Sequence, residues 1–181
     1  LITLHQRKHF YVFPKTGAFH NEKTNAWEQR ELGDEIQTLP FKYLLAVPQT
    51  GGIYPIIQQG DTPIAGFAND TPFFNYKDVV LFGDHTLSLY RPQKPFLIAT
   101  DGIKIIKSDN LNSDFLYYYL ETYKPYSEGY KRYFSILIEQ KGSKPLSLIE
   151  QQKIGQFFRG LDRLITLHQR KHFYVFPKTG A

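Results

Sequence analysis

The sequence predicts an α+β fold, in which a β-rich globular domain is followed by one long α-helix. Short runs of β-branched and aromatic residues, separated by turn residues, fill the middle of the chain. Near its end, apolar residues recur every three or four positions. In addition, residues 1–18, LITLHQRKHFYVFPKTGA, recur unaltered as residues 164–181. A repeat of this length does not arise by chance, so both ends occupy the same point of a repeating unit. A slice of a tandem protein, a natural or engineered half-unit and a recombined cassette are equally compatible with it.

The globular part is predicted to contain five strands separated by turns. Pairs of turn-forming residues (glycine, asparagine and aspartate) separate the strands at residues 51–52, 60–61, 69–70 and 101–102. The predicted strands are residues 53–57, 79–82, 86–90, 96–99 and 103–106. A short helix is expected over residues 114–123, capped by Asn112, Ser113 or Asp114, and a second one over residues 28–36.

The long helix has the clearest local pattern. Ser147 and Glu150 have the spacing of a capping box, and Pro177 and Gly180 mark the end. Apolar residues then recur in steps of three and four, which predicts a helix over residues 148–173 of roughly 40 Å. Because such a helix extends beyond a small domain, part of its apolar stripe is expected to pack against a second helix or a second copy. The expected partner-facing residues are Ile154, Phe157, Leu161, Leu164 and Ile165. Packing of the whole stripe on the helix's own domain is the alternative.

Composition limits the class of protein. The chain has 181 residues, enough for one domain with an appendage, and no Cys or Met, which excludes disulfides and thiolate metal sites. Its longest uncharged run, residues 43–60, is broken by proline and glycine and could not cross a bilayer as a helix. We therefore expect a cytoplasmic protein that does not bind membranes.

The net charge of +5 is unevenly distributed. Residues 1–113 hold eleven basic and eleven acidic residues, whereas residues 114–181 hold eleven and six. A local basic field of this kind favours a polyanionic partner, and double-stranded DNA is the first candidate. A solvated helix face would give the same excess without any function.

Residues 123–133 interleave four tyrosines with three cations in a stretch that contains glycine and proline and is expected to be a mobile loop. Cations can neutralise phosphates, and tyrosines can contact phosphates, sugars or bases. Glutamine amides can read base edges in the major groove. The candidate DNA-binding residues are Gln58, Gln59, Thr62, His85, Tyr130, Lys131 and Arg132.

No known catalytic motif was found in the sequence, so no catalytic residue is assigned. Asp84, Asp101 and Lys104 have a weak likeness to a metal-dependent nuclease, without a further carboxylate to pair with them. His168 and His172 would share a helix face, as would His5 and His9, but neither pair has a third ligand for zinc. We therefore expect no metal site and no cofactor in this chain.

Residues 150–171, EQQKIGQFFRGLDRLITLHQRK, preceded by Pro145 and Leu146, strongly resemble the spacer helix of type I restriction-modification specificity subunits. Residues 27–34 are similar to the start of a target recognition domain in that family, and residues 80–86 and 99–104 to its central strands. The resemblance covers residues 27–171, and its helix motif is the more specific part.

The resemblance implies a subunit that reads DNA and performs no chemistry itself. Such subunits carry two recognition domains and two antiparallel spacer helices, which set the distance between half-sites and dock methyltransferase subunits. A restriction and translocase subunit completes the complex. S-adenosylmethionine, ATP and Mg would be bound by these partners.

The resemblance divides the chain into four segments. They are the tail of a preceding spacer helix (1–18), a DNA target recognition domain (19–145), a spacer and dimerisation helix (146–176) and a tail (177–181). We expect half of a specificity subunit, which would homodimerise through its long helix and direct its partners to a bipartite target. Two alternatives remain: the specificity fragment of a fused restriction enzyme, and a methyltransferase-docking module that does not read DNA.

Overall fold

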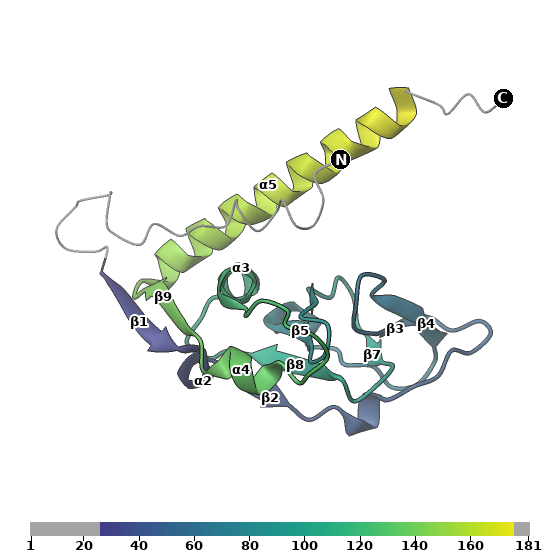
Figure 1. Cartoon of the computed structure of the whole chain (residues 1–181). Helices are drawn as coiled ribbons and strands as arrows, with labels where there is room; N and C mark the ends of the chain where they lie inside the picture. The colour runs from purple at the N-terminus through teal and green to yellow at the C-terminus, as the bar shows by residue number, and fades with distance from the viewer. Residues whose placement is uncertain (1–25, 176–181) are drawn as a thin grey trace.

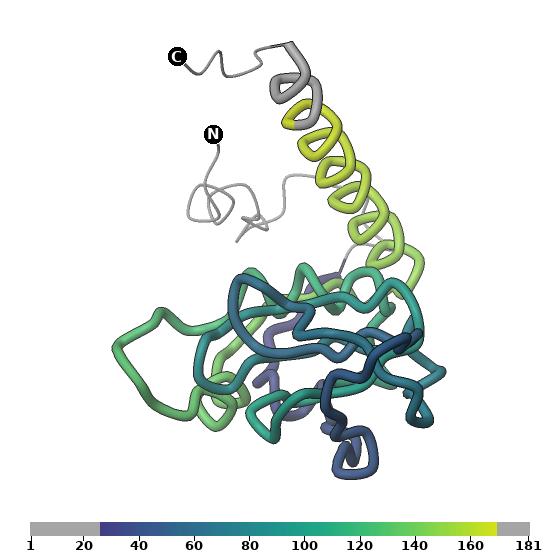
Figure 2. Tube along the Cα trace, turned by 90° about the vertical axis from the view of Figure 1, so that its right-hand side faces the viewer, coloured from purple at the N-terminus to yellow at the C-terminus, as the bar shows by residue number. Residues whose placement is uncertain are grey.

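A computed structural model describes the backbone of residues 26–175 and the side chains of residues 26–169. It confirms the α+β class and the long C-terminal helix, which projects from one side of the domain (Figures 1 and 2). The strands are β1 (Trp27–Glu31), β2 (Gln37–Leu39), β3 (Tyr54–Ile57), β4 (Ile64–Ala68), β5 (Val79–Gly83), β6 (Leu89–Tyr90), β7 (Leu97–Ile98), β8 (Ile103–Lys107) and β9 (Lys141–Pro145). The helices are α2 (Leu32–Glu35), α3 (Ser113–Tyr123), α4 (Phe134–Ile138) and α5 (Leu148–Val175), with 3-10 turns η1 (Lys42–Leu44) and η2 (Tyr76–Asp78). None of the described helices is long and apolar enough to cross a membrane.

The strands form two sheets and a separate ribbon. The larger sheet has the order β2-β8-β5-β6 and is antiparallel throughout. The smaller sheet has the order β4-β3-β7, with β3 antiparallel to β4 and parallel to β7. Among the described residues, β1 and β9 pair only with each other, so these two strands meet next to the start of α5 (Figure 1).

β5 is buried at all five positions because it lies between two hydrophobic cores. Successive side chains of a strand point to opposite faces of its sheet. Val80 and Phe82 accordingly join the core beneath α3 and α5, whereas Val79 and Leu81 join the core shared with the smaller sheet. The larger sheet is therefore the middle layer of the domain.

The predicted strands over residues 53–57, 79–82 and 103–106 are confirmed, but two others are shorter than expected. Only Leu89 and Tyr90 of residues 86–90 pair, because Gly83 to Ser88 form a tight turn in which Leu87 has a φ of 57°. Only Leu97 and Ile98 of residues 96–99 form a strand. β4 was not predicted, since its sequence IAGFA shows no clear alternation of apolar and polar residues.

The helix over residues 114–123 is confirmed, and its N-cap is Asn112, whose Oδ1 accepts hydrogen bonds from the backbone N–H of Asp114 and Phe115. The predicted helix over residues 28–36 is wrong, because residues 27–31 are strand β1 and only residues 32–35 are helical. The pairing with β9, more than one hundred residues away, decides between these conformations.

The β1–β9 ribbon is joined by a buried ion cluster. Lys144 is 6% exposed, and its Nζ lies 3.0 Å from Glu28 Oε1 and 3.3 Å from Glu35 Oε2. A buried ammonium group needs such partners, since it has lost its hydration. Lys144 is one of the basic residues counted in the last third of the chain, but its charge is used within the domain.

α5 begins where the capping motif predicted. The Glu150 N–H donates to Ser147 Oγ at 3.4 Å, and the Glu150 carboxylate accepts a hydrogen bond from Trp27 Nε1 at 3.2 Å. Gln151 is 1% exposed; its Oε1 accepts from the Asn112 N–H at 2.8 Å, and its Nε2 donates to the Pro145 carbonyl at 2.9 Å. One buried amide therefore joins the starts of α3 and α5 to the end of β9. The repeated residues 1–18 lie outside the described part of the chain.

Candidate nucleic-acid interface

The candidate DNA-binding residues come from three separate segments, which the fold brings together. Gln58, Gln59 and Thr62 lie in the turn after β3, His85 lies in the turn after β5, and the others lie in the loop between α3 and α4. We call these three segments, residues 58–62, 84–88 and 124–133, the recognition loops. The α3–α4 loop projects from the side of the domain (Figure 2).

The first two recognition loops are joined by hydrogen bonds. The His85 N–H donates to Gln59 Oε1 at 3.1 Å, and the Gly60 N–H donates to Ser88 Oγ at 2.9 Å. Within its own turn, Gln58 Nε2 donates to the Thr62 carbonyl at 2.8 Å, while Thr62 is exposed. The two glutamines that were predicted to read bases thus already use part of their amide groups inside the protein.

His85 also joins the third recognition loop. Its ring stacks on that of Tyr130 with centroids 4.8 Å apart and an angle of 6° between the planes. Its Nδ1 lies 3.2 Å from the Lys131 carbonyl oxygen. Because a carbonyl can only accept, this contact places a hydrogen on Nδ1 and leaves Nε2 as the second polar atom of the ring. Tyr130 itself is 87% exposed, and its ring is held by the stacking contact with His85.

Asp84 fastens the second loop to the third. Its side chain is buried, and Oδ1 accepts from the Phe134 N–H at 2.8 Å, while its carbonyl accepts from the Tyr133 N–H at 2.8 Å. Lys104 Nζ lies 3.8 Å from Oδ2. This carboxylate therefore holds the start of α4 and is directed into the protein. Its position does not support the weak likeness of Asp84, Asp101 and Lys104 to a metal-dependent nuclease.

The α3–α4 loop, which was expected to be mobile, contains hydrogen bonds that hold its centre. Tyr133 is fully buried; its hydroxyl donates to the Gly129 carbonyl at 2.6 Å and accepts from the Glu128 N–H at 2.7 Å. A buried hydroxyl that serves both roles closes the turn over residues 128–129. Tyr126 and Tyr130 remain exposed on its outer side.

Charge on this surface is partly compensated. Lys131 Nζ lies 2.6 Å from Glu128 Oε2. The hydrogen bond between them raises the pKa of Lys131 and lowers the pKa of Glu128. Arg132 is exposed and, within residues 26–169, forms no ion pair. Lys124, the third cation, is largely buried and lies 2.8 Å from Glu121 Oε1. The loop therefore offers a phosphate the guanidinium of Arg132, and the ammonium of Lys131 once it leaves Glu128.

Residues 26–169 contain no group of three or more His, Asp or Glu side chains that could hold a metal ion. His168 lies on an exposed part of α5. His5, His9 and the side chain of His172 lie outside the described residues, so the predicted histidine pairs are not tested.

The expected partner-facing residues of α5 are divided between the core of the domain and the solvent. Ile154 and Leu161 pack against the core of the domain together with Phe158, whose ring lies 5.3 Å from that of Tyr118. Phe157 and Leu164 are instead 63% and 62% exposed. Ile165 is half-buried. The apolar stripe read from the sequence is thus two adjacent stripes. We call the exposed one, formed by Phe157, Gly160, Leu164 and Leu167, the outer stripe.

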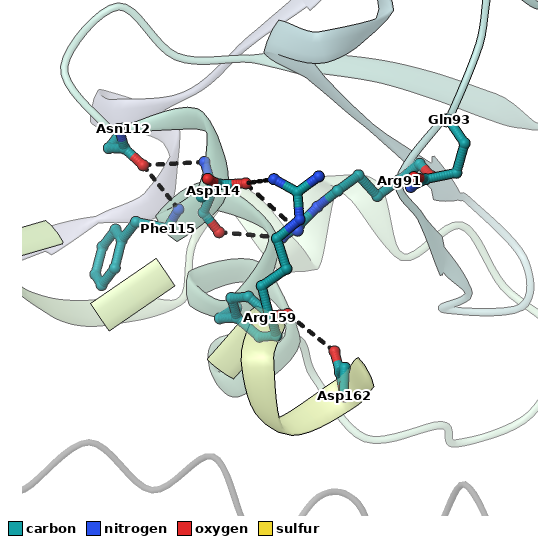
Figure 3. A network of polar contacts seen from close by, with 8 residues as sticks. Arg91, Gln93, Asn112, Asp114, Phe115, Arg159 and Asp162 are labelled. Atoms are coloured by element: carbon teal, nitrogen blue, oxygen red, sulfur yellow. Dashed lines mark hydrogen bonds and ion pairs between the residues drawn. The ribbon is translucent and has the colours of Figure 1, made fainter. Parts of the chain in front are cut away.

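The joint between α3 and α5 combines close packing with ion pairs. A Cβ at Gly155 would lie 2.6 Å from the Phe115 nitrogen, so α5 crosses α3 at this glycine. Asp114 Oδ1 lies 2.8 Å from Arg159 Nη1 and 3.6 Å from Arg91 Nη1 (Figure 3). Tyr118 donates a hydrogen bond to Asp162 at 2.9 Å, and burial is the main cause of its raised pKa. These contacts fix the direction in which α5 leaves the domain.

The fold and the candidate interface define a class of protein: a mixed-sheet domain with clustered surface loops, from which one long helix projects. No family model matches the sequence, and no curated protein matches it. Three solved structures have the same fold, and all belong to type I restriction-modification systems. They confirm, at the level of the fold, the resemblance to a specificity subunit with one target recognition domain.

The first is the S subunit from M. genitalium, with 17% identity, a TM-score of 0.59 and coverage of 84% of this chain and 42% of that one. The second comes from a structure concerned with complex assembly and conformational transition of the type I R-M system. It has 18% identity and a TM-score of 0.63, and the match covers 95% of this chain and 46% of that one. The third is the HsdS subunit from Thermoanaerobacter tengcongensis, with 19% identity, a TM-score of 0.56 and coverage of 97% of this chain and 46% of that one. This chain thus spans less than half the length of each.

Proposed function

We propose that this chain recognises one half of a bipartite DNA target, as half of the specificity subunit of a type I restriction-modification complex. The observation that carries the proposal is the shared fold: one domain and one long helix match less than half of each of three chains from type I restriction-modification systems, two of which are S subunits. The recognition loops supply the groups that such a task requires, since they join cations, exposed tyrosines and polar side chains on one surface.

The chain itself carries out no chemistry in this proposal. Methylation, ATP-driven translocation and cleavage belong to methyltransferase and restriction subunits, which bind S-adenosylmethionine, ATP and Mg. The solved structure concerned with assembly of a type I R-M system supports partners of this kind. Two copies of the chain would pair through the outer stripe of α5 and present two recognition domains to a target with two-fold symmetry.

Methylome sequencing of cells that express this chain with its methyltransferase subunit tests the proposal. We expect methylation confined to one interrupted palindrome. A complex that forms but methylates no defined sequence would favour the docking module without DNA reading. Mg-dependent nicking of DNA by the purified chain would favour the fragment of a fused restriction enzyme.

The salt dependence of duplex binding tests the interface itself. Each phosphate contact that is lost reduces the slope of log K against log salt by about 0.9. We expect this reduction for Arg132→Gln and no reduction for Arg163→Gln, an exposed position on α5. Equal slopes for the wild type and Arg132→Gln would remove Arg132 from the interface.

A further inference from the structure

Gln59 lies where the recognition loops meet, and we propose that it is a positioning residue and not a reader of bases. In this view its side chain holds the backbone of His85, and His85 in turn holds the exposed ring of Tyr130. The inference rests on the proposed function for its consequence on DNA, but its structural part concerns the free protein alone.

The first observation is the hydrogen bond from the His85 N–H to Gln59 Oε1 at 3.1 Å. An amide nitrogen cannot accept this bond, so the orientation of the Gln59 amide follows from the donor. A glutamine that recognises adenine uses its oxygen and its nitrogen together. One lone pair of the Gln59 oxygen is already engaged, and the Gln59 nitrogen lies against Gly102, so the amide cannot turn toward a base without releasing His85.

The second observation is that two glycines leave room for the Gln59 side chain. A Cβ at Gly83 would lie 2.7 Å from Gln59 Cβ, and a Cβ at Gly102 would lie 2.7 Å from Gln59 Nε2. Neither glycine has a positive φ, so their backbone conformations are open to any residue. At Gly102 Gln59 occupies the space that a Cβ would need, and at Gly83 Gln59 shares that space with the hydroxyls of Thr86 and Ser88, each 2.5 Å from such a Cβ.

The third observation is the chain of contacts that leads outward from His85. Its ring donates from Nδ1 to the Lys131 carbonyl and lies parallel to the ring of Tyr130. Tyr130 is 87% exposed, and among the described residues its ring contact is with His85. A shift of the His85 backbone would therefore release an aromatic side chain that is otherwise preorganised.

Nuclear magnetic resonance of the free protein tests the structural part. The stacked Tyr130 ring shifts the carbon-bound protons of the His85 ring upfield, and Tyr130→Ala provides the unstacked reference. We expect Gln59→Leu to move these signals toward the reference, and Gln59→Glu, whose carboxylate can accept the same hydrogen bond, to keep them near wild type. Wild-type positions in Gln59→Leu would overturn the proposal. Should that variant not fold, Gln59→Asn replaces it, with the same expected direction, because its shorter amide draws away from His85.

Selection from a randomised duplex library, with each variant bound to the methyltransferase subunit, tests the consequence on DNA. A positioning role predicts that Gln59→Leu loses roughly tenfold in discrimination, about 1.4 kcal/mol, spread over the half-site, and that Gln59→Glu selects the wild-type sequence. A change confined to one base pair in both variants would show base reading and contradict the inference. If even the wild type selects no sequence, the proposed function fails, while the resonance result still decides the positioning role.

Discussion

At the scale of single residues, the recognition loops depend on side chains that do not face the solvent. Asp84 and Tyr133 are buried, and their hydrogen bonds fix backbone groups of the second and third loops. A functional interpretation of Asp84 from its sequence neighbours was therefore misleading, because a buried carboxylate close to a lysine also serves to hold a helix start. The groups available to DNA are those that this scaffold displays.

Glu128 is expected to weaken duplex binding, because it competes with phosphates for Lys131. Glu128→Gln should tighten binding to duplex by roughly two- to fivefold at low salt, since an exposed ion pair contributes little to stability and its loss frees the cation. Fluorescence anisotropy over a salt series measures this change. Glu31→Gln, an exposed carboxylate on β1, is the control. Identical affinity for Glu128→Gln and wild type would place Lys131 outside the interface.

Glu28 is expected to make the fold sensitive to acid. Its hydrogen bond with Lys144, together with that from Arg30, lowers its pKa below the ordinary value of 4.5. A lowered carboxyl pKa stabilises the fold above the unfolded pKa, and this contribution is lost as the pH falls through the folded pKa. Urea unfolding between pH 7 and roughly pH 3 should show a shallower loss of stability in Glu28→Gln than in wild type. Glu31→Gln should retain the wild-type slope, and a wild-type slope in Glu28→Gln would contradict the assignment.

At the scale of elements, α5 has two functions on two adjacent stripes. Ile154, Phe158 and Leu161 anchor the helix to the domain, whereas Phe157, Leu164 and Leu167 of the outer stripe are exposed. The steps of three and four in the sequence could not separate these stripes, because their positions are neighbours around the same helix. Gly155 allows its stripe to meet α3, because a Cβ there would collide with the backbone of Asp114 and Phe115.

Two glycines of α5 provide a matched pair for this arrangement. A Cβ at Gly155 would collide with the backbone of Asp114 and Phe115, whereas a Cβ at Gly160 would meet nothing within 4 Å. Gly155→Ala should therefore lower the free energy of unfolding by about 1–3 kcal/mol. Gly160→Ala should raise it by about 0.5–1 kcal/mol, because alanine favours the helix. Chemical denaturation measures both, and equal effects of the two substitutions would refute the proposed helix crossing.

At the scale of the whole molecule, the joint between α3 and α5 sets the position of the recognition loops relative to the helix axis. Arg91, which follows β6, meets Asp114 of α3 and Arg159 of α5 at this joint (Figure 3). Gln151 connects the joint to the end of β9. A rigid connection matters for a protein that would measure the distance between two half-sites, because any bend at the joint would change that distance.

Pairing of two chains is expected to depend on the outer stripe. Leu164→Glu should weaken self-association at least about tenfold, since a charge enters an apolar contact, and should leave the fold intact because the side chain is 62% exposed. Thr166→Glu, an exposed position outside this stripe, introduces the same charge as a control. Sedimentation equilibrium over a range of concentrations measures both. A wild-type chain that remains monomeric, or a Leu164→Glu chain that associates normally, would refute pairing through this stripe.

The local pattern of residues was sufficient to predict the α+β class and the central strands β5 and β8. It also predicted the starts of α3 at Asn112 and of α5 at Ser147. These features depend on neighbours in the sequence: alternation along a strand, and caps within three residues of a helix start. The same pattern identified the parts of the candidate interface but could not bring them together, because nothing in residues 58–62 indicates that they lie beside residues 84–88.

Contacts between distant residues decided the rest. β1 is a strand and not a helix because β9 lies beside it, and Lys144 is buried because Glu28 and Glu35 meet it there. Gln59 acquires its role from the backbone of His85, and the two stripes of α5 are distinguished only by the domain that covers one of them. Hydrogen bonds and close packing act over a few ångströms in space, whatever the separation along the chain, so only folding reveals which side chains remain free to act.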